Sequence, residues 1–403
     1  MSASADLLTL PSPSVAAANA PGGVTEPHSL LKGVRICFLA GTLGQGGAEQ
    51  QLFYMLSALR KMGARPHLLT LTQGEFWEER VATSGVPVEW VGQNSSRLAR
   101  AIRVCKTIKR LNPQIIQSQH FYTNPYAGLA ATLSRRGAVA AVRNDGLSEI
   151  QASGKMASWI GLRLARVVAA NSRLGIRNLV RCGFSPRRFF LLPNVINTDS
   201  YPKPVGKSNR RAVILGVGRL VRQKRFDRFL KVFSHVHAQT GGNVEARIVG
   251  AGALADTLKA MVGELKLPTT AVRFEGNVAD VRPFYAAADV LLLTSDHEGT
   301  PNVVMEAMAS GLPVVSTDVG DVSELVKDGL SGFLVERENA AGAASAVESL
   351  LSSPGMRMGF GREGRRIIET QRSLKLLPEW LQHLYQRVLL WKDRPHERMR
   401  DAA

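Results

Sequence analysis

Short apolar runs alternate with helical patterns along most of this chain, and this alternation restricts its fold more than any other feature. The first half has such runs at Val34–Ala40, His67–Leu71, Gln114–Gln117, Ala138–Val142 and Val167–Ala170. The second half has them at Ala212–Val217, Glu245–Val249, Ala271–Glu275, Val290–Leu293, Val314–Ser316 and Gly332–Val335. Helical patterns separate them, starting with a helix from about Ala48 to Lys61. Strands that alternate with helices form parallel sheets covered on both faces, so the pattern predicts an α/β fold.

A polar, Pro-containing stretch at residues 201–210 interrupts the alternation and is interpreted as a linker. We therefore predict a flexible tail (1–32), a first Rossmann-like domain (33–202), a second one (203–378) and a C-terminal helix (379–403). Ligands of doubly wound sheets bind beyond the strand carboxyl ends, so the chemistry is expected in a cleft between the domains.

The composition is that of a folded, water-soluble protein, with 45% apolar and 21% charged residues in 403. No apolar run reaches the length of a membrane span, and the Ala-, Ser- and Pro-rich start lacks the pattern of a signal peptide. The three cysteines, Cys37, Cys105 and Cys182, have no metal-ligand or redox spacing. These features favour a cytoplasmic location.

Positive charge is concentrated in the first half of the chain. Residues 1–200 contain 23 Lys and Arg against 10 Asp and Glu, and the whole chain carries +18. One predicted helix holds six basic residues between 97 and 110, with Leu98, Ala101, Ile102, Cys105 and Ile108 expected to face the core. The basic face is either a solvated surface or a contact with an anionic membrane. Nucleic acid is not expected as a partner, because no recognised binding motif is present.

Two glutamates with seven residues between them, Glu298 and Glu306, mark the most informative motif. Thr300 is expected to cap a helix that begins at Pro301 and ends at Gly311. Glu298 then precedes the helix and Glu306 lies within it. The helix N-terminus between them would offer backbone N–H groups to an anion. Two carboxylates that bind hydroxyl groups on either side of an anion site suit a sugar joined to a phosphate.

Other polar residues follow predicted strands at the cleft edge. The loop from Gly41 to Glu49 carries Gly46 and Gly47 but matches neither the dinucleotide fingerprint nor a P-loop. Arg219 and Lys224 bracket a loop after the first strand of the second domain, where they could neutralise a diphosphate without a metal. His120, Arg143 and Asp145 also follow strands and could reach the cleft, although a structural His and a capping Asp are the alternatives.

These residues resemble the retaining glycosyltransferases of family 4 ("group 1"), which have the two-domain GT-B fold. The matching pieces, from about residue 34 to 335, are Gly46–Glu49, Ala170–Ser172, Leu192–Ile196, Val217–Leu220 with Gln223–Lys224, Val249–Gly252, Phe274–Gly276, Ala288–Val290, Glu298–Pro313 and Gly320–Val335. The resemblance implies an acceptor domain followed by a donor domain, with the C-terminal helix crossing back onto the first.

The resemblance also implies roles for individual residues. Arg219 and Lys224 would hold the donor diphosphate, Glu298 would contact the donor sugar, and Glu306 would bind the ribose hydroxyls. Further donor contacts are expected from Gly46, Gly47, Gly299, Thr300, Pro301 and Asn302. His120 would be a catalytic residue in the first domain, and Arg143 and Asp145 possible acceptor-binding residues. Arg225 departs from the family pattern, which usually has Gly there, and its role is open.

The sequence thus predicts a retaining, metal-independent hexosyltransferase that uses a nucleotide-diphosphate sugar, with UDP as the expected nucleotide. The expected acceptor is a lipid-linked glycan of cell-envelope or exopolysaccharide synthesis, reached from the inner face of the plasma membrane. The alternatives are an epimerase or hydrolase of the same fold, and a non-catalytic sugar-nucleotide-binding protein. Intact Arg219, Lys224, Glu298 and Glu306 argue against the second alternative.

Overall fold

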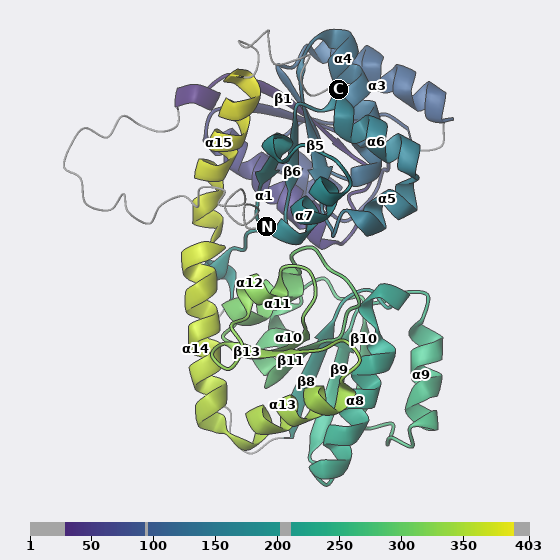
Figure 1. Cartoon of the computed structure of the whole chain (residues 1–403), viewed down its shortest axis with the longest axis vertical. Coiled ribbons are helices and arrows are strands. Elements are labelled where there is room, and N and C mark those ends of the chain that lie inside the picture. Colours follow the sequence, from purple (N-terminus) through teal and green to yellow (C-terminus); the bar gives the residue numbers. More distant parts are fainter. Residues whose placement is uncertain (1–28, 93–95, 202–210, 391–403) are drawn as a thin grey trace, which may run out of the picture.

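Two parallel β-sheets form the framework of the protein (Figure 1), seen in a computed structural model that describes residues 29–92, 96–201 and 211–390. The first sheet has the strand order β3-β2-β1-β4-β5-β6-β7. Its strands are β1 (Arg35–Ala40), β2 (Arg65–Thr70), β3 (Val88–Trp90), β4 (Ile115–Ser118), β5 (Gly137–Val142), β6 (Val167–Ala170) and β7 (Phe189–Leu191). The second sheet has the order β10-β9-β8-β11-β12-β13. Its strands are β8 (Ala212–Val217), β9 (Val244–Val249), β10 (Val272–Gly276), β11 (Val290–Leu293), β12 (Val314–Thr317) and β13 (Gly332–Val335).

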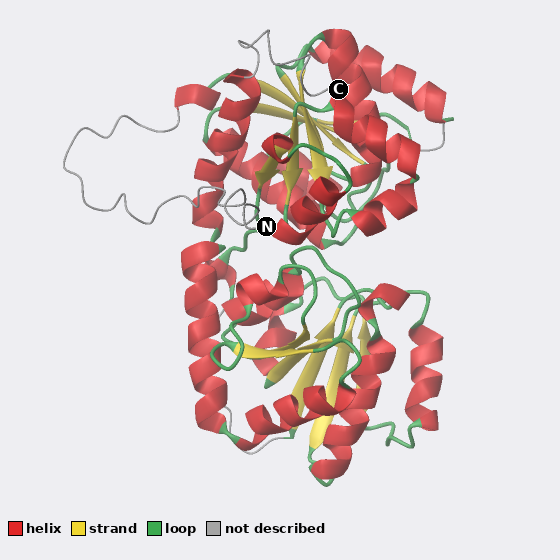
Figure 2. Cartoon of the chain, viewed as in Figure 1, coloured by secondary structure: helices red, strands yellow, loops and turns green. Residues whose placement is uncertain are grey.

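Helices cover both faces of each sheet (Figure 2), which confirms the predicted α/β class. The first unit contains α1 (Gly47–Lys61), α2 (Glu78–Thr83), α3 (Arg97–Leu111), α4 (Asn124–Ser134), α5 (Leu147–Ser153), α6 (Lys155–Leu164) and α7 (Arg173–Arg181). The second contains α8 (Phe226–Gln239), α9 (Ala255–Glu264), α10 (Arg282–Ala287), α11 (Asn302–Ala309), α12 (Val322–Leu325), α13 (Ala340–Ser352) and α14 (Pro354–Gln371). A last helix, α15 (Leu377–Leu390), follows.

The strand order reverses at one place in each sheet, and this reversal positions a binding site. β1 lies between β2 and β4, and β8 lies between β9 and β11. The helices that follow two neighbouring strands then leave on opposite faces, which opens a crevice beyond the strand carboxyl ends. The two edge strands of the first sheet, β3 and β7, were not predicted, because three residues are too few to show an alternating pattern.

The chain crosses between the two units twice, and the crossings lie side by side. Val195 belongs to the core of the first unit, whereas Ile196 packs into the core of the second. On the return, the N–H of Ile196 donates to the carbonyl of Arg372 at 2.8 Å and that of Leu374 donates to the carbonyl of Ile196 at 2.8 Å. The unit boundaries therefore fall near residues 195 and 373, earlier than the predicted 202 and 378. The predicted linker at 202–210 lies outside the described residues.

Helix α15 completes the core of the first unit. Trp380, Leu381, Leu384 and Val388 pack with residues of α1 and the first sheet. The hydroxyl of Tyr385 donates to Gln117 Oε1 at 2.6 Å, inside the core. Figure 1 shows α14 beside the second unit and α15 beside the first, on the same side of the molecule. The helix thus crosses back, as expected, and residues 391–403 lie outside the described part.

The predicted tail (1–32) extends too far into the folded chain. Residues 1–28 lie outside the description, but Ser29–Leu31 forms a 3-10 turn and Leu31 is 1% exposed in the core of the first unit. Apolar burial fixes this turn to the domain. No helix among the described residues is long and apolar enough to cross a membrane.

The basic helix forms as α3, but the predicted apolar face is right only at its end, where Ile108 is buried and Cys105 packs against the core. Val104, Thr107 and Ile108 are its buried residues, whereas Leu98 and Ile102 are 72% and 48% exposed. Residues 104, 107 and 108 define the stripe that faces the sheet, and positions 98 and 102 lie about a third to half a turn away from it. Two large apolar side chains of this basic helix therefore face solvent.

Candidate active site

A cavity of about 760 Å³ lies between the two sheets, and the strand carboxyl ends surround it. The second unit contributes Val217 and Val249 at the ends of β8 and β9, and the first contributes Arg143 and Asn171 just beyond β5 and β6. Eleven of the thirteen predicted site residues line this cavity: Gly46, Gly47, Arg143, Arg219, Lys224, Glu298, Gly299, Thr300, Pro301, Asn302 and Glu306. The other two, His120 and Asp145, do not.

Glu298 is paired with Lys224 at the wall of the cavity. The Lys224 ammonium donates to Glu298 Oε1 at 2.6 Å, and the Ser295 hydroxyl donates to the same oxygen at 2.7 Å. The two charged side chains are 14% and 9% exposed. Because the lysine satisfies one carboxylate oxygen, the other oxygen is available to accept from a ligand hydroxyl.

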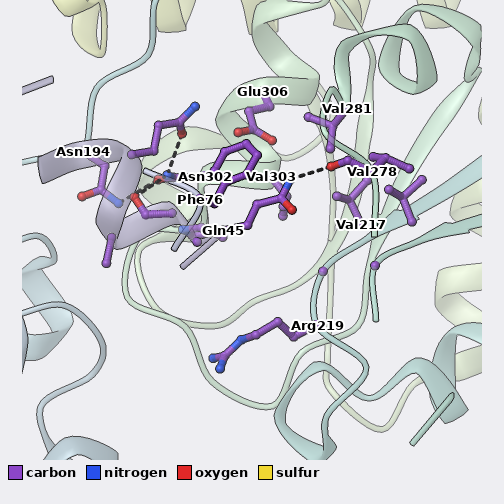
Figure 3. A pocket seen from close by; sticks show the side chains of 18 of the residues that line it. Gln45, Phe76, Asn194, Val217, Arg219, Val278, Val281, Asn302, Val303 and Glu306 are labelled. Carbon is purple, nitrogen blue, oxygen red and sulfur yellow. Dashed lines mark hydrogen bonds between the residues drawn. The ribbon is translucent and has the colours of Figure 1, made fainter. Parts of the chain in front are cut away.

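Arg219 is an exposed cation beside this pair. Its guanidinium makes no ion pair or side-chain hydrogen bond with the residues that the structure describes, although its side chain lines the cavity. Figure 3 shows it on the far side of the pocket from Glu306, without a dashed contact. A guanidinium presents five donors in a planar fork that fits phosphate oxygens, so Arg219 is suited to bind a diphosphate.

Glu306 lies deeper and is held by a tyrosine. The hydroxyl of Tyr285, from α10, donates to Glu306 Oε2 at 2.7 Å. Burial raises the pKa of the Glu306 carboxyl, and the hydrogen bond from Tyr285 opposes that rise. Tyr285 was not predicted, because a single tyrosine in a short helix has no pattern of its own. With Oε2 occupied, Oε1 can accept a hydrogen bond from a diol.

Two helix N-termini meet the cavity without a side-chain cap. Helix α11 begins at Asn302 with Pro301 as its cap residue, and α1 begins at Gly47 with Gly46 as its cap residue. Their free N–H groups and positive dipole ends favour an anion. The predicted capping role of Thr300 is wrong, because its hydroxyl instead donates to the carbonyl of Asn171 at 2.8 Å, across the two units.

Polar contacts join the two units around the same cavity. Asn194 donates to the Thr300 carbonyl at 3.0 Å and to Asn302 Oδ1 at 2.9 Å, and Asn302 in turn donates to the Gly47 carbonyl at 3.1 Å. A Cβ added at Gly47 would lie 2.7 Å from Asn302 Nδ2, so only glycine permits this approach. The predicted Gly46–Gly47 loop and the predicted α11 start are thus brought into contact.

A carboxylate of the second unit caps a helix of the first. Asp321 accepts from the backbone N–H groups of Arg173 at 2.6 Å and Leu174 at 3.0 Å, at the start of α7. Burial raises the pKa of Asp321, and these two hydrogen bonds oppose that rise. This contact joins the two units at a second place, away from the two chain crossings near residues 195 and 373.

His120 lies behind the glycine loop rather than in the cavity. Its Nδ1 accepts from the N–H of Gly41 at 3.0 Å, and its Nε2 lies 3.1 Å from Glu49 Oε1. A nitrogen that accepts carries no proton, so this geometry describes a neutral ring whose Nε2–H donates to Glu49. Glu49 lies against Gly46, where an added Cβ would be 2.3 Å from its Oε2. His120 is not among the residues that line the cavity, and its contacts are those of a residue that holds the loop. Its catalytic role stays a prediction.

Of the two possible acceptor-binding residues, the structure brings one to the cavity. Arg143 lines it and donates to the Gln119 carbonyl at 3.4 Å. Burial lowers the pKa of its guanidinium to about 10, so the side chain is cationic at neutral pH. Asp145 instead accepts from the N–H of Ser148 at 2.8 Å at the start of α5, which is the capping alternative.

The structure gives a role to Arg225, the residue that stands where the family usually has glycine. Its backbone is left-handed, with φ 50°, which explains why glycine suits the position. Its guanidinium donates to Asp227 at 3.0 Å and to Asp296 at 3.1 Å. Asp296 stands two residues before Glu298, so Arg225 fixes the loop that carries the glutamate.

Part of the cavity lining is aromatic and was not predicted. Phe76, Trp77 and Arg80 line the cavity from the first unit, and the Arg80 guanidinium lies 4.0 Å from the centre of the Phe76 ring. The signal was available, because Phe76 and Trp77 follow the second strand at the cleft edge.

Comparison with known families accounts for both units. The model described as "Glycosyltransferase Family 4" matches residues 45–200, and "Glycosyl transferases group 1" matches residues 197–367. The chain belongs to the family 4 glycosyltransferases. The two matches meet near residue 200, close to the first crossing between the units.

Known relatives match parts of the chain to different extents. The lipopolysaccharide core biosynthesis glycosyltransferase LpsE of Rhizobium meliloti is 30% identical over 41% of this chain, and the match spans about half, 47%, of LpsE. The GDP-mannose-dependent phosphatidylinositol monomannoside mannosyltransferase of Mycolicibacterium smegmatis is 28% identical over 80% of this chain and 90% of its own length.

Solved structures confirm the GT-B fold. HepE of Anabaena, crystallised with UDP, superposes with a TM-score of 0.76 and 21% identity, over 88% of this chain and all of HepE. The galactosyltransferase WaaB gives a TM-score of 0.68 and 19% identity, over 89% of this chain and all of WaaB. At this identity the likeness establishes the fold alone.

Proposed function

We propose that the protein is a retaining, metal-independent hexosyltransferase that moves a sugar from a nucleotide-diphosphate sugar to a hydroxyl group of a lipid-linked glycan. One observation carries the proposal: Glu298 and Glu306 stand at either side of the uncapped start of α11, in a cavity that also holds Arg219. Carboxylates suit the hydroxyls of a sugar and a ribose, and the helix end and the cation suit the diphosphate between them.

In the proposed reaction, the bond between the anomeric carbon and the diphosphate breaks as the acceptor oxygen forms a bond to the same face. The acceptor proton passes to the leaving phosphate oxygen, so no protein base is required. Arg219, Lys224 and the N–H groups of α11 offset the charge on the leaving diphosphate. Glu298 binds a hydroxyl of the transferred sugar, and Glu306, held by Tyr285, binds the ribose. His120 keeps the glycine loop in place through Gly41 and Glu49.

UDP is the proposed nucleotide and an envelope or exopolysaccharide precursor the proposed acceptor. HepE is described in complexes with UDP and with UDP-glucose. LpsE is named for lipopolysaccharide core synthesis, and CapM of Staphylococcus aureus for capsular polysaccharide synthesis. Phe76, Trp77 and Arg143 on the first unit offer ring faces and a cation to the acceptor. We place the enzyme in the cytoplasm, at the inner face of the plasma membrane.

Thermal unfolding with UDP, GDP or ADP, each in the presence of EDTA, tests the donor site. A nucleotide at about 100 times its Kd stabilises the protein by roughly 2.7 kcal/mol, so one responding nucleotide identifies the donor class. Absence of any response contradicts the proposal, and a response that needs a divalent metal contradicts metal independence. Incubation with the matching nucleotide sugar, without acceptor, tests the alternative: rapid release of free sugar or of an epimer indicates a hydrolase or epimerase.

A further inference from the structure

Three neighbouring helices of the first unit expose large apolar side chains. These are Leu98 and Ile102 of α3, Leu129 and Leu133 of α4, and Met156, Trp159 and Ile160 of α6, which have between 37% and 79% of their surface exposed. We call this set, with the basic residues of α3 and α6, the α3-α4-α6 face. The described part of the second unit exposes only two comparable side chains, Leu330 and Met358.

The three helices pack side by side, so their exposed residues belong to one side of the unit. α4 contacts both α3 and α6. The join with α6 is close, because an added Cβ at Gly128 would lie 2.7 Å from Leu164. Within each helix the exposed residues follow a three- or four-residue spacing, as one stripe does: 98 and 102, 129 and 133, and 156, 159 and 160. Figure 1 shows these helices gathered on the side of the first unit away from α14 and α15.

The charge on this face is predominantly positive. Six Lys and Arg residues belong to α3 and two to α6, and the three helices contain no Asp or Glu. One of the eight cations, Arg110, pairs with Glu89 of the neighbouring strand β3. The Arg163 guanidinium lies 3.5 Å from the centre of the Trp159 ring, which places a cation directly beside an exposed indole. Tryptophan with a neighbouring cation is suited to the boundary between lipid headgroups and acyl chains.

We propose that the α3-α4-α6 face binds an anionic lipid bilayer, with its apolar side chains inserted among the acyl chains and its basic side chains on the phosphate groups. The combination of apolar stripes with cations is that of an interfacial membrane-binding surface. A second copy of the chain does not fit, because a twofold contact would bring two sets of eight cations together and none of the three helices supplies a carboxylate to compensate them. A nucleic acid backbone would leave the apolar stripes unused.

Membrane binding by this face rests on the proposed function in one respect: its purpose is to keep the cavity near a lipid-linked acceptor. Vesicle binding is measured without any sugar nucleotide, so it succeeds or fails independently of the transfer activity.

The test is co-sedimentation of the full chain with vesicles of phosphatidylcholine, alone or mixed with phosphatidylglycerol. We expect binding to the anionic vesicles, weakened by salt. The charge-reversal pair Lys106→Glu with Lys109→Glu should lower the vesicle partition coefficient at least about 25-fold, since each basic residue near the surface contributes about five-fold. The matched pair Lys231→Glu with Lys259→Glu, on the second unit, changes the net charge equally and should leave most of the binding intact.

The apolar half of the proposal has its own variants. Trp159→Ser with Ile160→Ser should also weaken binding, whereas Met358→Ser should not. Vesicles should shift the tryptophan emission to the blue, and Trp159→Phe should abolish that shift while the protein still sediments. Thermal unfolding with and without nucleotide shows that each variant is folded.

Several results overturn the proposal. An equal loss in both charge-reversal pairs means that net charge, not this face, governs binding. Binding that is indifferent to Trp159→Ser with Ile160→Ser excludes insertion. A concentration-dependent dimer that this double substitution dissociates assigns the face to a second copy. Binding of duplex DNA in place of vesicles at the same salt assigns it to nucleic acid.

Discussion

Replacing Lys224 by alanine should damage both stability and turnover, whereas the same change at Arg219 should damage turnover alone. Lys224 and Glu298 are 14% and 9% exposed and 2.6 Å apart. Removal of one partner from a buried pair costs roughly 3–5 kcal/mol, because the remaining charge stays desolvated. The Ser295 hydroxyl still donates to Glu298, and the carboxylate borders the cavity, so we expect the lower end, about 3 kcal/mol.

A unit of the size of residues 211–372 converts that free energy into a fall in Tm of roughly 6–12 °C. Differential scanning fluorimetry of both variants measures it. Arg219→Ala should melt with the wild type, since its guanidinium has no partner among the described residues. Both variants should lose about 10²-fold or more in kcat.

The double variant Lys224→Ala with Glu298→Gln provides the control. A neutral amide has no buried charge to leave unpaired, so its Tm should return most of the way to that of the wild type. The argument from the buried pair is refuted if Lys224→Ala melts at the wild-type temperature. It is also refuted if adding Glu298→Gln does not raise the Tm of Lys224→Ala.

Three other substitutions test separate features. Glu149 lies in α5, where its carboxyl accepts from the backbone N–H of Arg143 at 2.9 Å. Burial raises its pKa from an ordinary 4.5 to about 7, so the wild type should lose stability as pH rises from 4.5 through 7, and Glu149→Gln should flatten the dependence of Tm on pH across that range. At Arg225, glycine should be tolerated better than alanine by about 1 kcal/mol, because only glycine adopts φ 50° freely; equal Tm values for the two would contradict this. Asp321→Ala leaves the Ser172 cap of α7 in place but removes the interdomain cap formed by the Asp321 carboxylate on two N–H groups, and should cost about 1 kcal/mol. Small-angle scattering should then show more of an open form, and an unchanged curve would mean that the cap does not hold the units together.

The fold was predictable from sequence because parallel strands buried on both faces are continuous apolar runs. All eleven expected strands occur within two residues of their predicted positions. The misses have physical reasons: β3 and β7 are three-residue edge strands, and the start of α3 does not follow the stripe that faces the sheet.

The gathering of Arg219, Lys224, Glu298 and Glu306 at one cavity was equally predictable, since these residues follow strand ends or lie in one short helix. What the sequence does not contain is the hydrogen-bond partner of each side chain. His120 follows β4 at the carboxyl edge of the first sheet, as predicted, yet its ring contacts Gly41 and Glu49. Such choices depend on packing between segments far apart in the chain.

The crossing of α15 has a consequence for how the protein is made. The core of the first unit is closed by residues 377–390, which leave the ribosome after the whole second unit. During synthesis, the apolar surface of α1 that α15 will cover therefore stays exposed until α15 has been made. Until then it is open to binding by chaperones or to aggregation. The same order of events means that a fragment cut near residue 195 lacks part of its own interior. Separate expression of the two halves should thus give a sound second half and a first half that needs α15 supplied in trans.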